Sequence, residues 1–445
     1  MHDLARKQAE LGEAVALSLS EARRLGASAA EADASFQNGF TVNVRLGEVD
    51  TVEYQRDRAL GITVYFGQRK ANASTADFKP QAVRDMVDKA CTMARYTGED
   101  FAAGLADPVE MARELPDLRL YHHWDLSPDE AIVLARDCES AGREVAGIAN
   151  SEGAAVTSHD GVRVYGNTHG FIGGYPSSSH SLSCSLLAGQ GDAMQRDYWY
   201  TTDRNPANLT APAEVGRLAA QRTLARVGAR QIDTRRAPVL FAAELSRGLF
   251  GALLGAISGG SQYRRASFLL DALGRSVFPQ FISLTERPHL PGAMGSAAFD
   301  GDGVSTREQS FIAAGELRSY VLSSYSARRL GMRTTGNAGG VHNLVVESSD
   351  GATDFEGLLR RMGSGLLVTE LMGQGVNGVT GDYSRGAGGF WIENGVLAYP
   401  VHEVTIAGNL ADMFRGIVAV GSDVDRRSAI HSGSVLIDSM TIAGR

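Results

Sequence analysis

Cysteine is scarce in this sequence, which has 3 cysteines among 445 residues. Cys91, Cys138 and Cys184 are widely spaced, and no two of them form a Cys-x-x-Cys pair. Disulfide scaffolds and cysteine-based zinc sites both need cysteines at closer or paired spacing. The sequence therefore predicts neither, and a reducing, cytoplasmic location fits best.

Positive charge is in the minority. The chain has 43 Lys and Arg against 51 Asp and Glu, so its formal net charge is −8 at pH 7. Its arginines are scattered singly, and no basic cluster interrupts the pattern. A protein of this charge repels polyanions unless basic residues gather on one surface. We therefore expect no nucleic-acid partner.

Long hydrophobic runs are also missing. The first residues, MHDLARKQAELGEAVALS, are polar and amphipathic and lack the apolar core of a signal peptide. The uncharged run at 248–261 is well short of the roughly 20 apolar residues that a membrane-spanning helix requires. The sequence therefore predicts no membrane segment.

The first block of the chain combines helices with alternating strands. Apolar positions recur at helical spacing over 3–25, strands follow at 40–46 and 60–66, and a second helix covers 81–96. Asn38-Gly39 is typical of a hairpin turn. This order of elements indicates an α+β layer.

A second block repeats that order after a polar connection at 107–118. Ser127 is placed to cap a helix that starts at Pro128. A strand with alternating apolar residues follows at 182–186, and another helix covers 212–228. The shared order of the two blocks hints at a duplication.

From Pro238 the pattern changes to short strands and glycine turns. Hairpin signals at 313–322 and 393–395 favour a β-barrel or a curved sheet. Helices are expected here at only three places: 243–258, 355–363 and near 410–416.

The expected fold class is α+β, with helix and antiparallel-sheet layers followed by a β-rich, barrel-like domain. A chain of this length is too long for one compact core. We divide it into an amino-terminal α/β domain, a central α/β domain and a carboxy-terminal β-rich domain, at 1–115, 116–235 and 236–445.

His402-Glu403 resembles the start of a zinc-protease helix but does not continue as one. The motif HExxH needs a second histidine four residues after the first, whereas this segment reads HEVTIA. Val401, Glu403 and Thr405 alternate with His402, Val404 and Ile406, which predicts a strand.

Three other stretches are better explained by structure than by chemistry. His122 and His123 are neighbours in a loop, where their side chains diverge, so we expect linker histidines. The glycine runs at 373–378 and 385–390 lack a Gly-Lys-Ser/Thr ending and predict tight β-turns. The serine-rich stretch at 175–185 predicts a strand with one hydroxyl-bearing face.

The segment GLLVTELMGQGVNGVTGDYSRGAGGFWIENGVLAYPVHEVTIAGNL (365–410) closely resembles the PmbA, or TldE, branch of the TldD/PmbA family. That family was once described as modulators of DNA gyrase. Further matching segments cover almost the whole chain: DRALGITVYFGQRKANASTADF (57–78), NSEGA (150–154), RDYWYTTDR (196–204), ASFLLDALG (266–274) and SSYSARRLGMRTTGNAGG (323–340).

The resemblance implies a cytoplasmic bacterial metalloprotease built from two homologous subunits. Its TldD-type subunit carries HExxxH on a helix, and a cysteine nearer the carboxy terminus completes a zinc site. The enzyme is associated with maturing a peptide microcin and with degrading a labile antitoxin. Histidines five residues apart need a locally widened helical turn to face one ion.

The corresponding stretch here, LFGALLGAISGGS, has none of these groups. The family's His, Glu and second His fall on Gly251, Ala252 and Ala256, and the later segment DRRSAIHSGS (425–434) offers only His431 as a soft-metal ligand. The resemblance therefore implies a degenerate, non-catalytic subunit that holds no metal. Zinc is expected in the TldD-type partner.

Glycine recurs on one side of this helix, at Gly248, Gly251 and Gly255. Each interior glycine costs about 0.5–1 kcal/mol relative to alanine. We expect another backbone to pack closely against this face and offset that cost.

Polar residues are dense among the glycine turns between 365 and 405. Because an unfolded peptide can be held by strand addition, these residues are candidates for lining a substrate path. The alternative is that they only satisfy turn backbones. The candidates are Glu370, Gln374, Asn377, Asp382 and Arg385.

The expected partners are a TldD-type subunit, an unfolded peptide substrate and, when the chain is alone, a second copy of itself. Homologous subunits can use equivalent surfaces for both pairings, here those of the carboxy-terminal domain. The alternative is a homodimeric peptide-binding or DNA-gyrase-modulating protein without a proteolytic role. A stand-alone hydrolase using GDYS (381–384) lacks a recognisable base.

Overall fold

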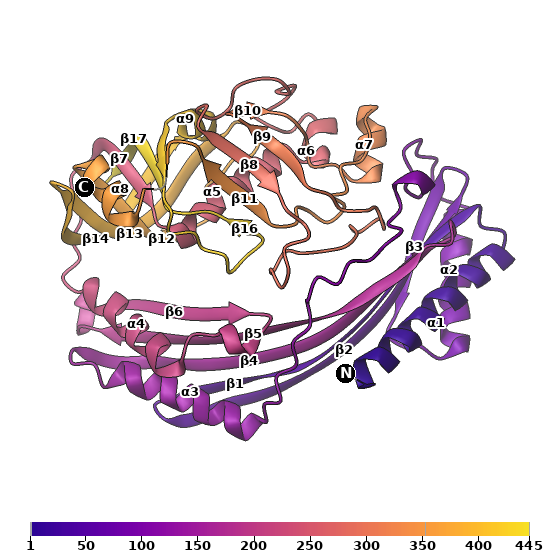
Figure 1. Ribbon diagram of the computed structural model, residues 1–445, viewed down its shortest axis with the longest axis horizontal. Coiled ribbons are helices and arrows are strands. Elements are labelled where there is room, and N and C mark those ends of the chain that lie inside the picture. The colour runs from indigo at the N-terminus through magenta and orange to yellow at the C-terminus, as the bar shows by residue number, and fades with distance from the viewer. Residues whose placement is uncertain (1, 352, 445) are drawn as a thin grey trace.

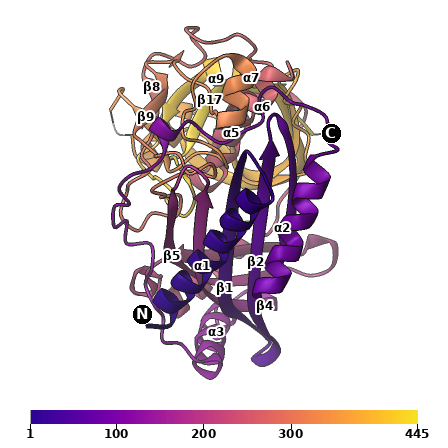
Figure 2. The same cartoon turned by 90° about the vertical axis from the view of Figure 1, so that its right-hand side faces the viewer.

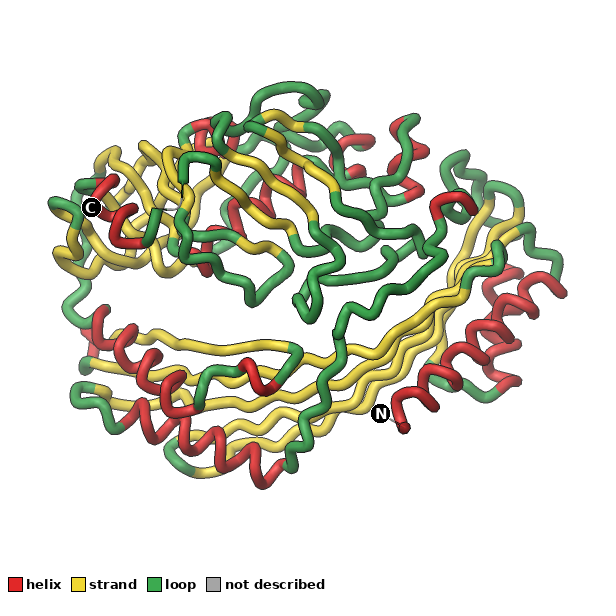
Figure 3. Tube along the Cα trace, viewed as in Figure 1, coloured by secondary structure: helices red, strands yellow, loops and turns green. Residues whose placement is uncertain are grey.

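The computed structural model describes residues 2–351 and 353–444. A long, curved antiparallel sheet carries helices on its convex face, and a β-rich domain lies on its concave side (Figures 1 and 3). The expected α+β class, with a barrel in the carboxy-terminal region, is confirmed. Within the described residues no helix is both long and apolar enough to cross a membrane.

The first block supplies one half of the long sheet. Its elements are α1 (His2–Arg24), β1 (Ala29–Arg45), β2 (Glu48–Phe66), β3 (Arg69–Thr75) and α2 (Pro80–Ala94). Helix α1 forms where apolar residues recur at helical spacing, and Leu11, Val15 and Leu19 of that stripe are buried. Both helices pack on the same side of the sheet (Figure 2).

The second block supplies the other half. Its elements are α3 (Pro128–Arg143), β4 (Ile148–Asn167), β5 (Ile172–Ala188), β6 (Gln195–Asp203) and α4 (Pro212–Ala225). Ser127 caps α3 as expected, because its side chain accepts from the Glu130 N–H while the Glu130 carboxylate accepts from the Ser127 N–H. Single 3₁₀ turns lie at Pro108–Glu110, Gly191–Ala193 and Pro206–Asn208.

The two blocks meet through their first strands. The strand order is β3-β2-β1-β4-β5-β6, so one half is the reverse of the other. β1 and β4 pair from Glu31↔Asn167 to Val44↔Ala154. The repeated order of elements is therefore confirmed, and it builds one continuous sheet.

The expected hairpin turn at Asn38-Gly39 is wrong. β1 runs straight through these residues and turns at Leu46-Gly47, where both residues have positive φ. A Cβ on Gly39 would lie 2.2 Å from the Ser158 carbonyl oxygen of β4. Glycine is needed here because a neighbouring strand approaches closely. In the sequence, such a glycine after an asparagine looks the same as a turn.

The described residues of the carboxy-terminal domain form two sheets. In the first, the order is β14-β13-β12-β7-β17-β15, and β14 also pairs with β17, so five strands close into a barrel. The second has the order β10-β9-β8-β11-β16. The strands are β7 (Arg235–Phe241), β8 (Ile282–Glu286), β9 (Gln309–Ala313), β10 (Glu316–Leu317), β11 (Leu344–Ser348), β12 (Gly365–Met372), β13 (Asp382–Glu393), β14 (Val396–Asn409), β15 (Ile417–Val420), β16 (Ile430–His431) and β17 (Val435–Ala443).

The two hairpins expected in this domain are confirmed. Asn394-Gly395 joins β13 to β14, and Ala314-Gly315 joins β9 to β10, with positive φ at all four residues. Three helices are also present where the sequence placed them: α5 (Ala243–Ala256), α8 (Phe355–Met362) and α9 (Leu410–Arg415).

Two further helices contradict the expectation of only three. They are α6 (Gly259–Tyr263) and α7 (Ser324–Leu330). Each begins with a capping serine, Ser258 or Ser323, and α7 ends at Gly331 in the left-handed region. Both are too short to show a helical repeat of apolar residues, so only their caps mark them in the sequence.

His402-Glu403 lies on a strand as expected, but the predicted alternation breaks there. The β13–β14 register passes from Gly389↔Val401 to Ala387↔Val404, and Glu403 has a φ of 50°. A bulge therefore places Val401 and Val404 on the same buried face.

Candidate functional site

Helix α5 carries the positions at which the family's zinc motif would fall, and it contacts β16, the strand that carries His431. Gly251 is exposed on this helix, whereas Ala256 is 2% exposed and packs into the domain core. Because α5 is a regular α-helix, residues five apart point about 140° away from each other. The two histidine positions of the motif therefore do not face a common point.

The expectation that a backbone packs on the glycine face of α5 is wrong for the described chain. A Cβ placed on Gly248, Gly251 or Gly255 would meet no other atom within 4 Å. These glycines border open space, so no contact within the chain offsets their conformational cost. Side chains would fit at these positions, yet the sequence places none there.

The residues in this region do not fit a zinc ion. Gly251, Ala252 and Ala256 supply no donor atom, and no group of three His, Cys, Asp or Glu side chains gathers among the described residues. His431 is 5% exposed, and its Nε2 has no hydrogen-bond partner among residues 2–351 and 353–444. Burial lowers the pKa of this imidazole, and the charge of Arg426 lowers it further. A single neutral imidazole is one ligand of the four that a structural zinc site needs.

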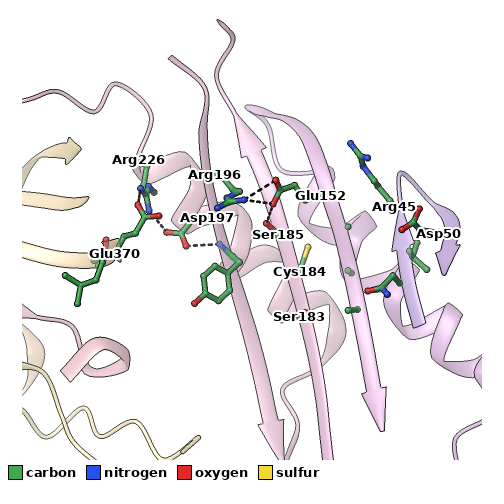
Figure 4. A pocket seen from close by; sticks show the side chains of 18 of the residues that line it. Arg45, Asp50, Glu152, Ser183, Cys184, Ser185, Arg196, Asp197, Arg226 and Glu370 are labelled. Atoms are coloured by element: carbon green, nitrogen blue, oxygen red, sulfur yellow. Dashed lines mark hydrogen bonds and ion pairs between the residues drawn. The ribbon is translucent and has the colours of Figure 1, made fainter. Parts of the chain in front are cut away.

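A cavity of about 540 Å³ lies between the concave face of the long sheet and the carboxy-terminal domain; we call it the concave cavity. Residues of β1, β4, β5 and β6 form one wall (Figure 4). The start of α5 at Leu245 and the end of β12 at 369–371 form the opposite wall.

The sheet wall of the concave cavity carries hydroxyls and an ion pair. Ser183 and Ser185 come from the serine-rich stretch, whose predicted hydroxyl-bearing strand face is confirmed in β5. The Ser185 hydroxyl donates to Glu152 at 2.9 Å, and Arg196 Nη1 lies 3.3 Å from the same carboxylate. These groups can donate to and accept from a polypeptide main chain.

A partly buried ion network lies at the wall of the cavity (Figure 4). Arg226 pairs with Glu370 and lies 3.6 Å from Asp197. Arg222 lies 3.5 Å from Asp197 and 2.9 Å from Glu244. The network joins α4, β6, α5 and β12, so it fixes the carboxy-terminal domain against the edge of the long sheet.

The structure brings only one of the five substrate-path candidates, Glu370, into the concave cavity. Gln374 and Asn377 lie in the exposed loop between β12 and β13, and Asp382 is the exposed first residue of β13. Asn377 Oδ1 accepts from the Val379 N–H at 2.9 Å, and Asp382 Oδ2 accepts from the Thr380 hydroxyl at 2.6 Å. In this chain these two side chains therefore satisfy the turn.

Arg385, the fifth candidate, is half-buried on β13. In the described part of the chain, neither its Nε nor the hydroxyl of the nearby Tyr383 has a hydrogen-bond partner. Burial raises the pKa of Tyr383 to about 12, so the hydroxyl keeps its proton.

Sequence reasoning missed most of the charged cavity residues. Glu152 lies in NSEGA, and Arg196 and Asp197 lie in RDYWYTTDR, two of the segments that carry the family resemblance. A charged residue inside a matched segment was the available signal. Arg226 has no such signal, because it joins the network only through the packing of α4 on the sheet edge.

The linker histidines are paired as expected. His123 Nδ1 lies 3.3 Å from Asp160, and His122 Nε2 lies 3.1 Å from the Arg119 carbonyl oxygen. They lie on the connection between the two blocks and do not converge on a common ligand.

Known proteins match the chain over nearly its whole length. Profiles for domain 1, the central domain and the carboxy-terminal domain of PmbA/TldA metallopeptidases match residues 30–94, 121–227 and 234–444. The chain is 48% identical to Metalloprotease PmbA of Escherichia coli O157:H7, over 99% of this chain and 97% of that protein. It is 46% identical to the PmbA homolog of Haemophilus influenzae, over 98% and 97%.

Solved structures share the fold. A candidate modulator of DNA gyrase from Bacteroides thetaiotaomicron superposes with a TM-score of 0.91 at 26% identity, over 97% of this chain and 98% of that one. TldE from Thermococcus kodakarensis superposes with a TM-score of 0.81 at 20% identity, over 97% and 100%, which is a likeness of fold alone. With these matches and the architecture described above, the chain belongs to the PmbA/TldD metallopeptidase family.

Proposed function

We propose that this chain is the PmbA/TldE-type, non-catalytic subunit of a heteromeric TldD/TldE metalloprotease. A TldD-type partner supplies zinc and the catalytic base, and the complex cleaves unfolded or small peptides, such as a microcin precursor or a labile antitoxin. The proposal places both subunits in the cytoplasm.

One observation carries the proposal: α5 has the position of the family's catalytic helix without its donor atoms. Space for a side chain exists at Gly251, but the residue has none. Ala256 is in the core, where a histidine has no room without repacking. The helix is regular over Ala243–Ala256, without the widened turn that HExxxH requires.

We assign peptide holding to the concave cavity. Its sheet wall offers hydroxyls and charged groups, and β6 is an edge strand that pairs only with β5 among the described strands. An edge strand binds an extended peptide through main-chain hydrogen bonds with little demand on sequence. This binding mode suits a complex that processes unfolded chains.

The exposed loop after β12 is the proposed contact with the partner. It carries Gln374 and Asn377 together with the exposed apolar residues Val376 and Val379, and it ends at Asp382, the first residue of β13. Apolar side chains beside polar groups are typical of surfaces that another protein covers. The loop lies in the domain through which we expect both heteromer and homodimer to form.

The test is reconstitution with a TldD-type subunit from the same cell. The mixture should cleave an unstructured peptide, and metal analysis should find zinc only in the partner. Ser183→Trp should fill the concave cavity and lower cleavage, while Ser35→Trp, on the same sheet face outside the cavity, should not. Full peptide cleavage by the partner alone, unchanged on adding this chain, contradicts the proposal.

The alternative is a peptide-binding or gyrase-modulating protein without a proteolytic role. The name of the Bacteroides structure favours it. A change in the supercoiling rate of purified gyrase on adding this chain, with no TldD-type protein present, would support this alternative.

A further inference from the structure

We propose that a second cavity binds the carboxylate of a peptide's carboxy-terminal residue. This cavity, which we call the junction cavity, measures about 610 Å³. It lies where the segment at 119–122, the end of β6, the loop at 287–294 and the segment at 424–431 meet. The inference rests on the proposed function, because it names the part of the peptide that this chain recognises.

Unpaired positive charge faces the junction cavity. Arg119, Arg287 and Arg426 line it, and neither Arg119 nor Arg426 has an ion-pair or hydrogen-bond partner for its side chain among the described residues. Arg287 Nη2 donates to Glu347 at 2.6 Å, yet its buried Nε has no partner in the part of the chain that the structure describes. Guanidinium groups without an ion-pair partner can bind a carboxylate through charge-assisted hydrogen bonds.

The acid beside these arginines is already engaged. Asp203 lines the cavity, and its Oδ1 accepts from the Asn205 N–H at 2.8 Å and from Asn208 Nδ2 at 3.2 Å. It therefore orders its own turn and leaves the arginines free for a ligand.

The cavity is held in shape before any ligand arrives. Arg204 donates to the carbonyl oxygens of Ala293 and Met294, at 3.1 and 2.8 Å, and so ties the loop at 287–294 to the end of β6. His431 also lines the cavity, is 5% exposed and has an Nε2 without a partner. The loop wall of the cavity is therefore fixed to the end of β6, and the Nε2 of His431 is available to a ligand.

The remaining wall distinguishes a peptide end from an inorganic anion. Leu290, Met294 and Val345 give the cavity an apolar side, and the amides of Asn205 and Asn208 lie on its rim. A carboxy-terminal residue brings a carboxylate for the arginines, an apolar side chain for the apolar wall and a main-chain amide for the asparagines. Phosphate uses the arginines alone.

The cavity is also placed to receive a peptide held by the concave cavity. Tyr198 lines the concave cavity and Thr202 lines the junction cavity, and both belong to β6. Four residues along a strand span about 14 Å. The two cavities therefore border the same edge strand at a distance that a few peptide residues bridge.

The experiment measures binding of the full chain to the fluorescein-labelled peptide Gly-Ser-Gly-Ala-Leu by fluorescence anisotropy. The peptide is used with a free carboxy terminus and as its amide. The amide should bind about tenfold more weakly, since it loses a charge-assisted hydrogen-bond pair. Arg119→Gln combined with Arg426→Gln should weaken the free acid to the level of the amide, while Arg361→Gln, an exposed arginine on α8, should change neither.

Three outcomes would overturn the inference. Equal binding of acid and amide to the unaltered chain rejects the carboxylate site and leaves the proposed function standing. No binding of either peptide rejects the proposed peptide-holding role together with this inference. Inorganic phosphate binding that depends on Arg119 and Arg426 but is not displaced by the peptide acid identifies a general anion site.

Discussion

Arg427 stacks on Trp199, with its guanidinium carbon 4.5 Å from the centroid of the indole ring. It also lies 4.3 Å from the ring centroid of Tyr200 and donates to the Tyr200 carbonyl oxygen at 2.9 Å. Arg427 also donates two hydrogen bonds to Asp425, at 2.9 and 3.0 Å, which fix the orientation of the guanidinium. A planar, bidentate cation therefore joins the carboxy-terminal domain to β6.

Replacing this cation should weaken the junction between the two layers. Arg427→Lys keeps the positive charge but loses both the bidentate pairing with Asp425 and the stacking on the aromatic rings. We expect the free energy of unfolding to fall by about 2 kcal/mol, measured by urea denaturation. Arg361→Lys on α8 is the matched control, and equal midpoints for the two variants would remove Arg427 from this role.

The isolated chain should hold no stoichiometric zinc, and rebuilding the motif should not change that. In the triple variant Gly251→His, Ala252→Glu, Ala256→His, the two histidines still point about 140° apart on a regular helix. The cysteine and its supporting groups are also missing. Elemental analysis after dialysis against a chelator is the measurement, and one retained zinc per chain in either protein contradicts the prediction.

The isolated chain should be a dimer that a TldD-type subunit disrupts. Light scattering should give about twice the 47.3 kDa mass of one chain, and mixing should yield a heteromer. Val376→Asp with Val379→Asp should prevent both pairings, because it charges the exposed loop. Val49→Asp places a charge at an exposed valine on β2 and serves as the control. A strictly monomeric unaltered chain would contradict the assembly proposal.

Asn377 and Asp382 should affect assembly through the loop that they order. Asn377→Ala removes an acceptor for the Val379 and Thr380 N–H groups, and Asp382→Ala removes the acceptor for the Thr380 hydroxyl. We expect weaker heteromer formation and slower peptide cleavage. If both variants assemble and cleave normally, these residues are not part of the substrate path.

Asp300 should make stability fall as pH rises. Burial, and then the charge of Asp302, raises the pKa of this carboxyl from 3.8 to about 7. The folded chain keeps a proton that the unfolded chain releases, so stability is greatest below about pH 4 for this group and is lost as pH rises to about 7. Asp300→Asn cannot ionise and should flatten that slope.

The measurement for Asp300 is the urea midpoint at about pH 5 and about pH 8. The midpoint of the unaltered chain should drop more between these values than that of Asp300→Asn, even though the variant loses the acceptor for the Ala338 N–H. The exposed Asp129→Asn on α3 should keep the unaltered slope. Parallel slopes in all three proteins would show that Asp300 is ionised in the folded state.

Local signals predicted much of the fold. The capping box at Ser127 and the turn at Asn394-Gly395 depend only on residues next to each other, so the sequence determines them. Asn38-Gly39 has the same local signal but a different cause. Its glycine is needed because the Ser158 carbonyl oxygen of β4 leaves no room for a Cβ. An Asn-Gly pair by itself therefore indicates either a turn or a glycine that a neighbouring strand approaches closely.

The candidate site was less predictable, because its groups converge from distant elements. Glu370 of the carboxy-terminal domain was identified from its place among glycine turns. Its partner Arg226, however, comes from the end of helix α4 in the second block. The glycine face of α5 was expected to be packed and is open, since the same pattern suits a close contact or an empty wall. Whether such a glycine face is packed or open depends on tertiary contacts, which the local sequence pattern does not specify.

The continuous pairing of β1 with β4 governs how this molecule can deform. The first and second blocks share hydrogen-bonded strands instead of a flexible joint, and β4 at 20 residues extends about 65 Å. Such a sheet has no hinge between the two blocks, so we expect it to deform only by bending along its whole length. If the concave cavity holds a peptide as proposed, we therefore expect the carboxy-terminal domain, and not the sheet, to move, and the contacts of Arg427 with Trp199 and Tyr200 to oppose that movement.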